Sequence, residues 1–260
     1  MNDAAGSGAS PPASLPLKVR LSVIARSLLV QAAWNYRTML GTGMAFALTP
    51  VLRHLYDDTG ALDRAVARHA SHFNAHPYLT PIALGVFARL EAEGESPETI
   101  ERFRVALRGP LGALGDRLVW AGWLPLCSLA AIVVSGFTSP AVGVLFFLVL
   151  YNAGHLALRV GGFSLGWARG ATVGGSLHAL DLPKQARRIE TGVALLVGVT
   201  MGTMIPGLEG TESFTMLGSA AGAGAVLGGY ALGPRAWRST AWAVTLIVGA
   251  LALTGGLFFH

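Results

Sequence analysis

The sequence has 260 residues, of which 52% are hydrophobic and only 13% carry a charge, whereas about a quarter of the residues are charged in a typical soluble domain. A net charge of +5 could indicate a nucleic-acid-binding protein, but in the second half of the chain the basic residues fall in short breaks between apolar segments. Composition therefore argues against a soluble domain and against nucleic acid as a partner. It favours a protein that lies in the lipid bilayer.

The 34 glycines fit this interpretation, because small residues let helices pack closely where lipid supplies no hydrophobic force between them. The lone cysteine, Cys127, lies inside an apolar segment, so the chain can form neither an internal disulfide nor a thiolate metal cluster. Residues 1–16 are rich in Gly, Ser, Pro and Ala, without the apolar region of a secretory signal, and we expect a disordered tail.

Residues 17–117 predict amphipathic and short apolar helices. Between Leu17 and Trp34, apolar residues recur at helical spacing among basic ones, which fits a helix on the anionic cytoplasmic face of a membrane or one packed on protein. The apolar run that ends at Pro50 and the run 78–90 are too short to cross a bilayer, which needs about 20 residues. We expect these two runs to be buried or re-entrant.

Two further helices are predicted in this half. The first begins after a loop at 57–60, and we expect it to continue until Pro77 stops it. The second has Ser96 as its N-cap and Pro97 in its first turn, and we expect it to end at Gly109-Pro110.

Residues 118–260 predict four to five transmembrane helices. The candidate spans are free of charged residues and cover 118–137, 140–158, 191–208, 214–233 and 241–259. The first two spans are joined so tightly that they could instead form a re-entrant hairpin. Basic residues gather in the breaks 159–190 and 234–240, so we expect both breaks, and the N-terminus, on the cytoplasmic side. The predicted fold class is an all-α integral membrane protein.

The densest polar cluster is the segment 68–77, which holds three histidines. His69, His72 and His76 are spaced i, i+3 and i+7, so on one helix they would share a face that could bind zinc or copper. No carboxylate or thiol completes such a site, and Pro77 should unwind the last turn. A hydrogen-bonding role at a broken helix end is the alternative.

The glycine-rich segment 109–116 is not a phosphate-binding P-loop, because no Gly-Lys-Ser/Thr follows it. Its last residue, Asp116, is either a functional acid paired with Arg117 or Arg108, or an exposed acid at the membrane interface. Asn152 and His155, at i and i+3 in the second span, could bind a ligand or bridge two helices.

Several of these segments, in order, resemble motifs of the IID component of the mannose/fructose/sorbose family of the phosphoenolpyruvate-dependent phosphotransferase system (PTS). They are Gln31-Ala32-Ala33-Trp34-Asn35-Tyr36, Arg68-His69 through Phe73-Asn74-Ala75-His76-Pro77, and Gly109-Pro110-Leu111-Gly112-Ala113-Leu114-Gly115-Asp116. Tyr151-Asn152, Arg159 and Phe163-Ser164-Leu165-Gly166-Trp167-Ala168-Arg169-Gly170 match later stretches. Beyond residue 170 the likeness is one of hydropathy only.

The resemblance implies a membrane subunit that pairs with a IIC protein in a hetero-oligomer and carries a hexose-type sugar across the bacterial cell membrane. Cytoplasmic IIA and IIB proteins would relay phosphate from HPr, so this chain would be neither an enzyme on its own nor the phosphorylated partner. No cofactor or metal is implied. His72 and Ala75 depart from the usual motif, which fits a changed substrate or a regulatory role.

We expect the sugar or its gate to be lined by Asn35, Asn74, His76 and Asp116, because amides and acids hydrogen-bond hydroxyl groups well. Arg68 would brace this substrate-binding site. The rival hypotheses are a non-transporting scaffold that recruits IIB-like proteins, and a metal transporter that uses the histidine cluster.

Overall fold

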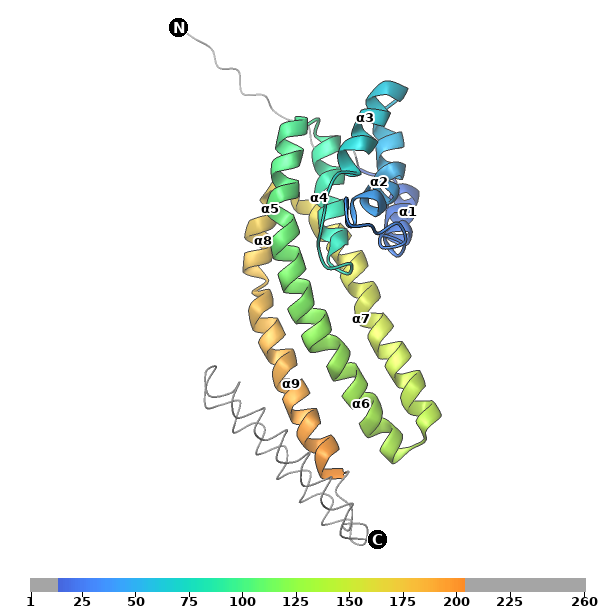
Figure 1. The fold of residues 1–260 in the computed structure, drawn as a ribbon, viewed down its shortest axis with the longest axis vertical. Coiled ribbons are helices and arrows are strands. Elements are labelled where there is room, and N and C mark those ends of the chain that lie inside the picture. The colour runs from blue at the N-terminus through green and yellow to red at the C-terminus, as the bar shows by residue number, and fades with distance from the viewer. Residues whose placement is uncertain (1–13, 204–260) are drawn as a thin grey trace. The chain divides into compact units, whose positions relative to one another are not determined.

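The computed structural model describes residues 14–203, and every regular element among them is a helix (Figure 1). In order these are α1 (Leu17–Ser27), α2 (Gly41–Leu55), α3 (Thr59–His69), α4 (Thr80–Ala92), α5 (Pro97–Gly115), a π-helix (Asp116–Trp123), α6 (Leu124–Phe137), α7 (Pro140–Arg169), a 3₁₀ turn (Gly170–Thr172), α8 (Val173–Ala179) and α9 (Leu182–Thr203). The expected all-helical class is confirmed for this part. The spans expected over 214–233 and 241–259 lie outside the described residues.

The described residues divide into two compact units. Unit 1 comprises 14–116 and His155–Asp181, and unit 2 comprises Arg117–Gly154 and 182–203. The split is therefore not one between a first and a second half of the chain, because the end of α7 and all of α8 belong to unit 1.

The core of unit 1 is built around the two short apolar helices α2 and α4. Nearly every residue of α4 is buried, and so is most of one side of α2. α2 packs against α1, α3 and α4, so amphipathic neighbours cover apolar surface that would otherwise face water or lipid (Figure 1). Both runs that are too short to span a bilayer are thus buried inside unit 1.

α4 and the end of α7 cross at two glycines. A methyl group on Gly85 would lie 2.3 Å from the Phe163 carbonyl oxygen, and one on Gly166 would lie 2.1 Å from the Ile82 carbonyl oxygen. The two backbones therefore touch at this crossing, which only residues without a Cβ allow.

The expected helix ends at prolines are wrong. α3 already stops at His69, well before Pro77. The apolar run up to Pro50 belongs to α2, which continues to Leu55. α5 passes through Pro110 to Gly115 and runs on into the π-helix, because neighbouring turns can hold a helix together across the one N–H that proline lacks. The predicted start of α5 is confirmed, since the Ser96 hydroxyl accepts a hydrogen bond from the backbone N–H of Thr99 at 3.2 Å.

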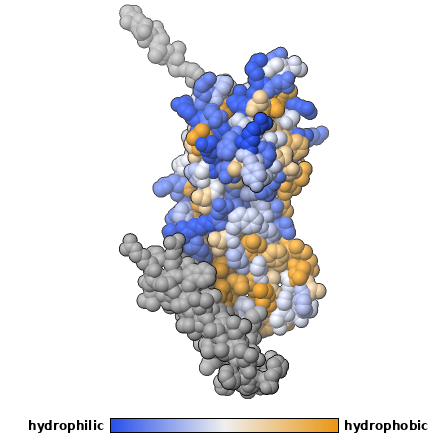
Figure 2. Space-filling model, in the orientation of Figure 1, coloured by the Kyte–Doolittle hydropathy of each residue, from blue (hydrophilic) through white to orange (hydrophobic). Residues whose placement is uncertain are grey.

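In unit 2, α6 packs along α9. The Arg117 guanidinium at the start of the π-helix donates to both carboxylate oxygens of Glu190 on α9, at 2.7 and 3.0 Å. Large hydrophobic side chains are exposed along α6 and the first half of α7, as the orange surface of Figure 2 shows.

Two helical stretches of the described chain, Pro97–Phe137 and Pro140–Ala179, are long and apolar enough to cross a membrane. The second begins at Pro140 as expected, but α7 does not stop at Leu158. The predicted loop over residues 159–190 is thus wrong for most of its length, because α7 continues to Arg169, α8 covers Val173–Ala179 and α9 begins at Leu182. α9 starts before the predicted third span and is described as far as Thr203.

Candidate functional site

A pocket of about 210 Å³ in unit 1 lies where three of the motif segments meet, and we call it the motif pocket. Its lining residues come from the loop after α1, the loop between α3 and α4, and the end of α5: Gln31, Trp34, Leu40, Asn74, Ala75, His76, Pro77, Gly112 and Asp116. Three of the five predicted site residues are therefore brought together: Asn74 and His76, from one loop, and Asp116, which lies far from them in sequence.

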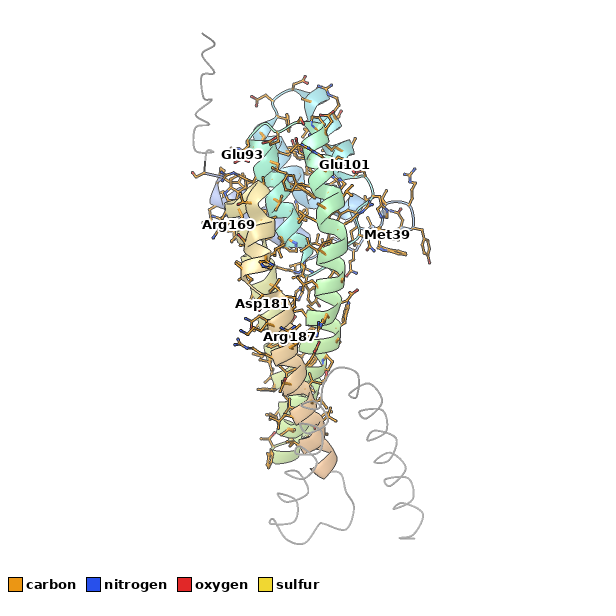
Figure 3. All side chains as sticks on the ribbon, turned by 90° about the vertical axis from the view of Figure 1, so that its left-hand side faces the viewer. Met39, Glu93, Glu101, Arg169, Asp181 and Arg187 are labelled. Atoms are coloured by element: carbon orange, nitrogen blue, oxygen red, sulfur yellow. The ribbon has the colours of Figure 1, made fainter. Side chains whose placement is uncertain are left out.

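Short backbone pairing holds the two loops of the motif pocket side by side. The Phe73 carbonyl accepts from the Leu40 N–H at 2.9 Å, and the Phe73 N–H donates to the Thr38 carbonyl at 3.2 Å. Phe73 itself is fully buried, so the loop is fixed by its side chain as well as by its backbone. Next to this pair lies Met39, at the positive φ of 52°, on the loop that Figure 3 labels. Asn74 and His76 therefore follow an anchored residue.

His76, in the loop between α3 and α4, is buried, and its contacts define both its tautomer and its charge. Its Nδ1 accepts a hydrogen bond from the Tyr78 backbone N–H at 3.2 Å, which places the ring proton on Nε2. Burial lowers the pKa of His76 to about 4, an effect that Asp116 opposes and Arg159 reinforces. The imidazole is therefore neutral at physiological pH.

Asn35, the fourth predicted residue, does not line the motif pocket. Its side-chain oxygen accepts from the N–H groups of Arg37 and Thr38 at 3.1 and 3.0 Å, and its amide nitrogen donates to the Thr38 hydroxyl at 2.8 Å. Asn35 thus shapes the turn that carries the pocket wall, as asparagine often does in loops.

Arg68 also lies elsewhere, in a buried ion network. It donates to the carboxylate of Glu91 at 2.7 and 3.0 Å, and His69 Nε2 lies 2.6 Å from the same carboxylate. The Tyr56 hydroxyl donates to Glu91 at 2.5 Å. Arg68 lines a different, larger cavity of about 810 Å³ between α3 and α5, together with charged residues such as Glu101, labelled in Figure 3. Arg68 is thus not among the residues that line the motif pocket.

The network shifts the pKa values of Glu91, His69 and Tyr56. Burial alone would raise the pKa of Glu91, but hydrogen bonds from His69, Tyr56 and Arg68 outweigh it and lower this pKa to about 2. Burial lowers the pKa of His69 against the pull of Glu91, and burial together with Glu91 raises the pKa of Tyr56. The Glu91 carboxylate thus gathers three donors from two segments of unit 1, the end of α2 and the end of α3.

Sequence reasoning missed Arg104, which is fully buried beside this network. Its Nη2 lies 3.1 Å from His69 Nδ1, and its guanidinium stacks over Phe87 at 5.2 Å. The signal was present, because residue 104 falls at helical spacing on the same face as the apolar Ile100 and Leu107. A charged residue on an apolar face predicts a buried partner.

Arg159 was missed in a different way, since it was read as a charge of a cytoplasmic loop. It is buried within α7, where its guanidinium donates to the Ser27 carbonyl, to the Ser27 hydroxyl at 3.1 Å and to His155 at 2.5 Å. The His155 ring stacks on Tyr78 with centroids 3.9 Å apart. Asn152, by contrast, donates to the Leu148 carbonyl of its own helix at 2.7 Å.

The histidines do not form the metal-binding face considered above. α3 ends at His69, so His72 and His76 belong to the following loop. Among residues 14–203 no group of three or more His, Cys, Asp or Glu side chains is arranged to hold a metal ion. Arg117, one of the two partners expected for Asp116, binds Glu190.

Comparison with known families decides the identity of the chain. Residues 15–211 match the model of the "PTS system mannose/fructose/sorbose family IID component". The chain belongs to this family. The resemblance that the sequence motifs indicated is thereby confirmed.

Characterised IID proteins share about 30% of their residues with it. The mannose-specific EIID component of Escherichia coli K12 is 30% identical over 191 residues, which are 70% of this chain and 65% of that protein. The fructose permease IID component of Bacillus subtilis 168 is 26% identical over 197 residues, 74% and 70% of the two chains. The sorbose-specific EIID component of Klebsiella pneumoniae is 29% identical over 192 residues, 71% and 68%. The match thus spans about two thirds of the length of these relatives.

Solved structures agree with the fold of the IID chain. A structure described as a membrane protein superposes with a TM-score of 0.65 at 28% identity, covering 73% of this chain and 71% of the other. A chain of the cryo-electron microscopy structure of the mannose transporter ManYZ with microcin E492 gives 0.57 at 27% identity, with the same coverage.

Proposed function

We propose that this IID chain forms, with a IIC membrane subunit, the permease of a phosphoenolpyruvate-dependent phosphotransferase system, and that it translocates a hexose-type sugar for phosphorylation by IIB. The IIA protein would supply IIB with phosphate. The chain itself would perform no catalysis. Family membership supports the role, and the motif pocket supports the nature of the substrate.

The observation that carries the proposal is the convergence of Asn74, His76 and Asp116 in one pocket. An amide, a neutral imidazole and an acid together offer donors and acceptors, which a sugar hydroxyl needs because it both donates and accepts. The pocket, at about 210 Å³, is smaller than the roughly 300–1,000 Å³ of sites for drug-sized ligands, so it suits a small polar molecule or one end of it. Trp34 adds a flat apolar wall.

We place the chain in the bacterial inner membrane as a multi-pass protein with its N-terminus in the cytoplasm. Lys184, Arg187 and Arg188, at the start of α9, support this orientation through the preference of basic residues for the cytoplasmic side. The exposed apolar side chains of α6 and α7 would face lipid or the IIC subunit.

The proposal is tested by measuring uptake of radiolabelled hexoses in cells that lack their own mannose-type permease. The chain is expressed with its IIC, IIA and IIB partners, and each partner is then omitted in turn. Uptake that needs both membrane subunits and yields sugar phosphate is the expected result. Absence of uptake for every common hexose, with the complex intact in the membrane, would contradict it.

The role of the motif pocket is tested separately with Asn74→Ala and Asp116→Asn. Both should reduce uptake while the complex still assembles, because each removes a hydrogen-bonding group of the pocket. Asn152→Ala is the matched control, since this exposed amide bonds only within its own helix among the contacts described above. Full uptake by Asn74→Ala would remove the pocket from the sugar path without refuting the permease.

A further inference from the structure

One edge of unit 1 exposes an unusual set of large hydrophobic side chains on α1 and the loop that follows it. We call it the α1 edge, and its residues, between 45% and 85% exposed, are Leu17, Leu21, Leu28, Leu29, Trp34 and Tyr36. The two aromatic rings touch edge to face with centroids 4.8 Å apart. Contiguous exposed apolar surface of this kind marks a place where a protein meets a membrane or a partner.

The exposure does not come from a loosely held helix. α1 packs on α2 through Val23 and Ser27, both fully buried, and Arg159 of α7 binds the Ser27 carbonyl. Leu17, Leu21 and Leu28 stand at i, i+4 and i+11 and so form a second apolar stripe on a different side of the same helix. The two environments that the sequence left open, membrane surface and protein, thus correspond to two faces of α1.

The charged residues on α1 and on the loop that follows it, residues 17–40, are all basic. Lys18 and Arg37 are exposed, and Arg20 and Arg26 flank them on α1. From Asp3 to Asp57 the sequence contains no acidic residue between these two. A basic surface with exposed leucines and an aromatic pair complements the headgroup layer of an anionic bilayer, which attracts basic residues and accommodates Trp and Tyr.

We propose that the α1 edge lies in the interfacial layer of an anionic lipid bilayer, with its leucines below the phosphate groups and Lys18 and Arg37 bound to them. α1 then anchors the loop of Gln31 and Trp34, two residues of the motif pocket, to the membrane surface. The inference needs only that the IID chain is a membrane protein, and it stands or falls independently of the sugar.

The test uses the full chain co-purified with its IIC partner in lipid nanodiscs. The lone cysteine is replaced (Cys127→Ala), and nitroxide labels are placed one at a time at Leu21→Cys and Leu28→Cys. Electron paramagnetic resonance then compares collision with oxygen, which concentrates in lipid, and with a water-soluble nickel chelate. A nitroxide carried on a lipid acyl chain serves as the lipid reference, and a label at Glu95→Cys, on an exposed polar turn, serves as the water reference.

In phosphatidylglycerol nanodiscs, labels at 21 and 28 should collide with oxygen as the lipid-borne nitroxide does, and little with nickel. In phosphatidylcholine, or with Lys18→Gln/Arg37→Gln, they should shift toward the water reference. Nickel access equal to that at 95 would overturn the proposal. Protection from both reagents would also overturn it, because it would mean that a protein partner covers the α1 edge. Equal immersion in both lipids would refute the recognition of anionic headgroups.

Discussion

Gly115 on α5 lies directly against His76, so that a methyl group at position 115 would stand 2.1 Å from the Cβ of the histidine. The absence of a side chain at Gly115 is therefore what lets His76 enter the motif pocket beside Asp116. Gly109 of the same helix has no such role, since nothing lies within 4 Å of a methyl group built on it.

We expect Gly115→Ala to push His76 out of place, to cost about 1–3 kcal/mol of stability through overpacking, and to raise the KM for sugar uptake. Gly109→Ala should leave uptake unchanged and slightly stabilise α5, because alanine favours a helix more than glycine does. The two variants are compared by uptake kinetics and by thermal unfolding in detergent. Equal KM values for both variants would show that His76 does not depend on Gly115.

The buried carboxylate of Glu91 should be among the most sensitive positions of unit 1. Glu91→Gln leaves Arg68 without the charge that offsets it, and breaking a buried pair of this kind costs about 3–5 kcal/mol. Glu93→Gln is the matched control on the same helix end, because its partly exposed pair with Arg89 is worth about 0.5 kcal/mol at most. Chemical unfolding of both variants measures the loss in free energy of unfolding. Similar losses for the two variants would contradict a stabilising role of the buried Glu91 network.

The contact between Glu91 and His69 predicts how the stability of the folded protein depends on pH. The pKa of Glu91 is about 2 in the folded protein against an ordinary 4.5, so its contribution is complete above pH 4.5 and is lost as the pH falls toward 2. The pKa of His69 is lowered from 6.5, so the unfolded chain takes up a proton first and acid below pH 6.5 also favours unfolding. Melting temperatures recorded from pH 7 to 3 should fall, and less steeply below 4.5 for Glu91→Gln. A flat profile for the unmodified protein would contradict the prediction.

The crossing of α4 and α7 gives a prediction on packing. Gly166→Ala places a methyl group against backbone atoms of α4, which cannot rotate away, so the helices must separate. We expect a loss of about 1–3 kcal/mol and reduced recovery of folded protein. Gly161→Ala on the same helix meets nothing within 4 Å and should be tolerated, as size-exclusion chromatography and thermal melts would show.

In unit 2, the pair of Arg117 and Glu190 predicts a charge swap. Arg117→Glu or Glu190→Arg alone places like charges together between the π-helix and α9, whereas the double variant restores an opposite pair. A double-mutant cycle on unfolding should give a coupling of about 0.5–1 kcal/mol, since part of the pair is exposed. Additive effects of the two substitutions would mean that the pair contributes nothing.

Local signals in the sequence predicted the local features well. The Ser96 cap, the start of α7 at Pro140 and the all-helical class follow from residue preferences within one or two turns. Proline was a poor guide to helix ends, because α2 and α5 pass through Pro50 and Pro110 where tertiary packing outweighs the lost hydrogen bond. Local propensity decides an end only where packing does not.

For the site, motif order located Asn74, His76 and Asp116 but did not give the roles of their neighbours. Asn35 uses its amide on its own turn, and Arg68 faces Glu91, a residue that stood unnoticed at the end of an apolar run. Such partners lie tens of residues apart, so no periodicity connects them. A charged residue on an apolar face, as at Arg104, is the one feature that could have indicated the buried network in advance.

The contact between Arg159 and Ser27 joins residues 132 positions apart, and unit 1 is interrupted in the sequence by the whole of residues 117–154. During synthesis, α1 to α5 emerge before the helix segment that completes them, and the hairpin of α6 and the first half of α7 must be made in between. Until the end of α7 is made, Ser27 and the surface of α4 around Gly85 remain uncovered. Apolar surface exposed at this stage can cause aggregation. Closure of so long a loop makes the return of α7 a slow step, so the order of translation and membrane insertion helps to decide whether the protein reaches its native state.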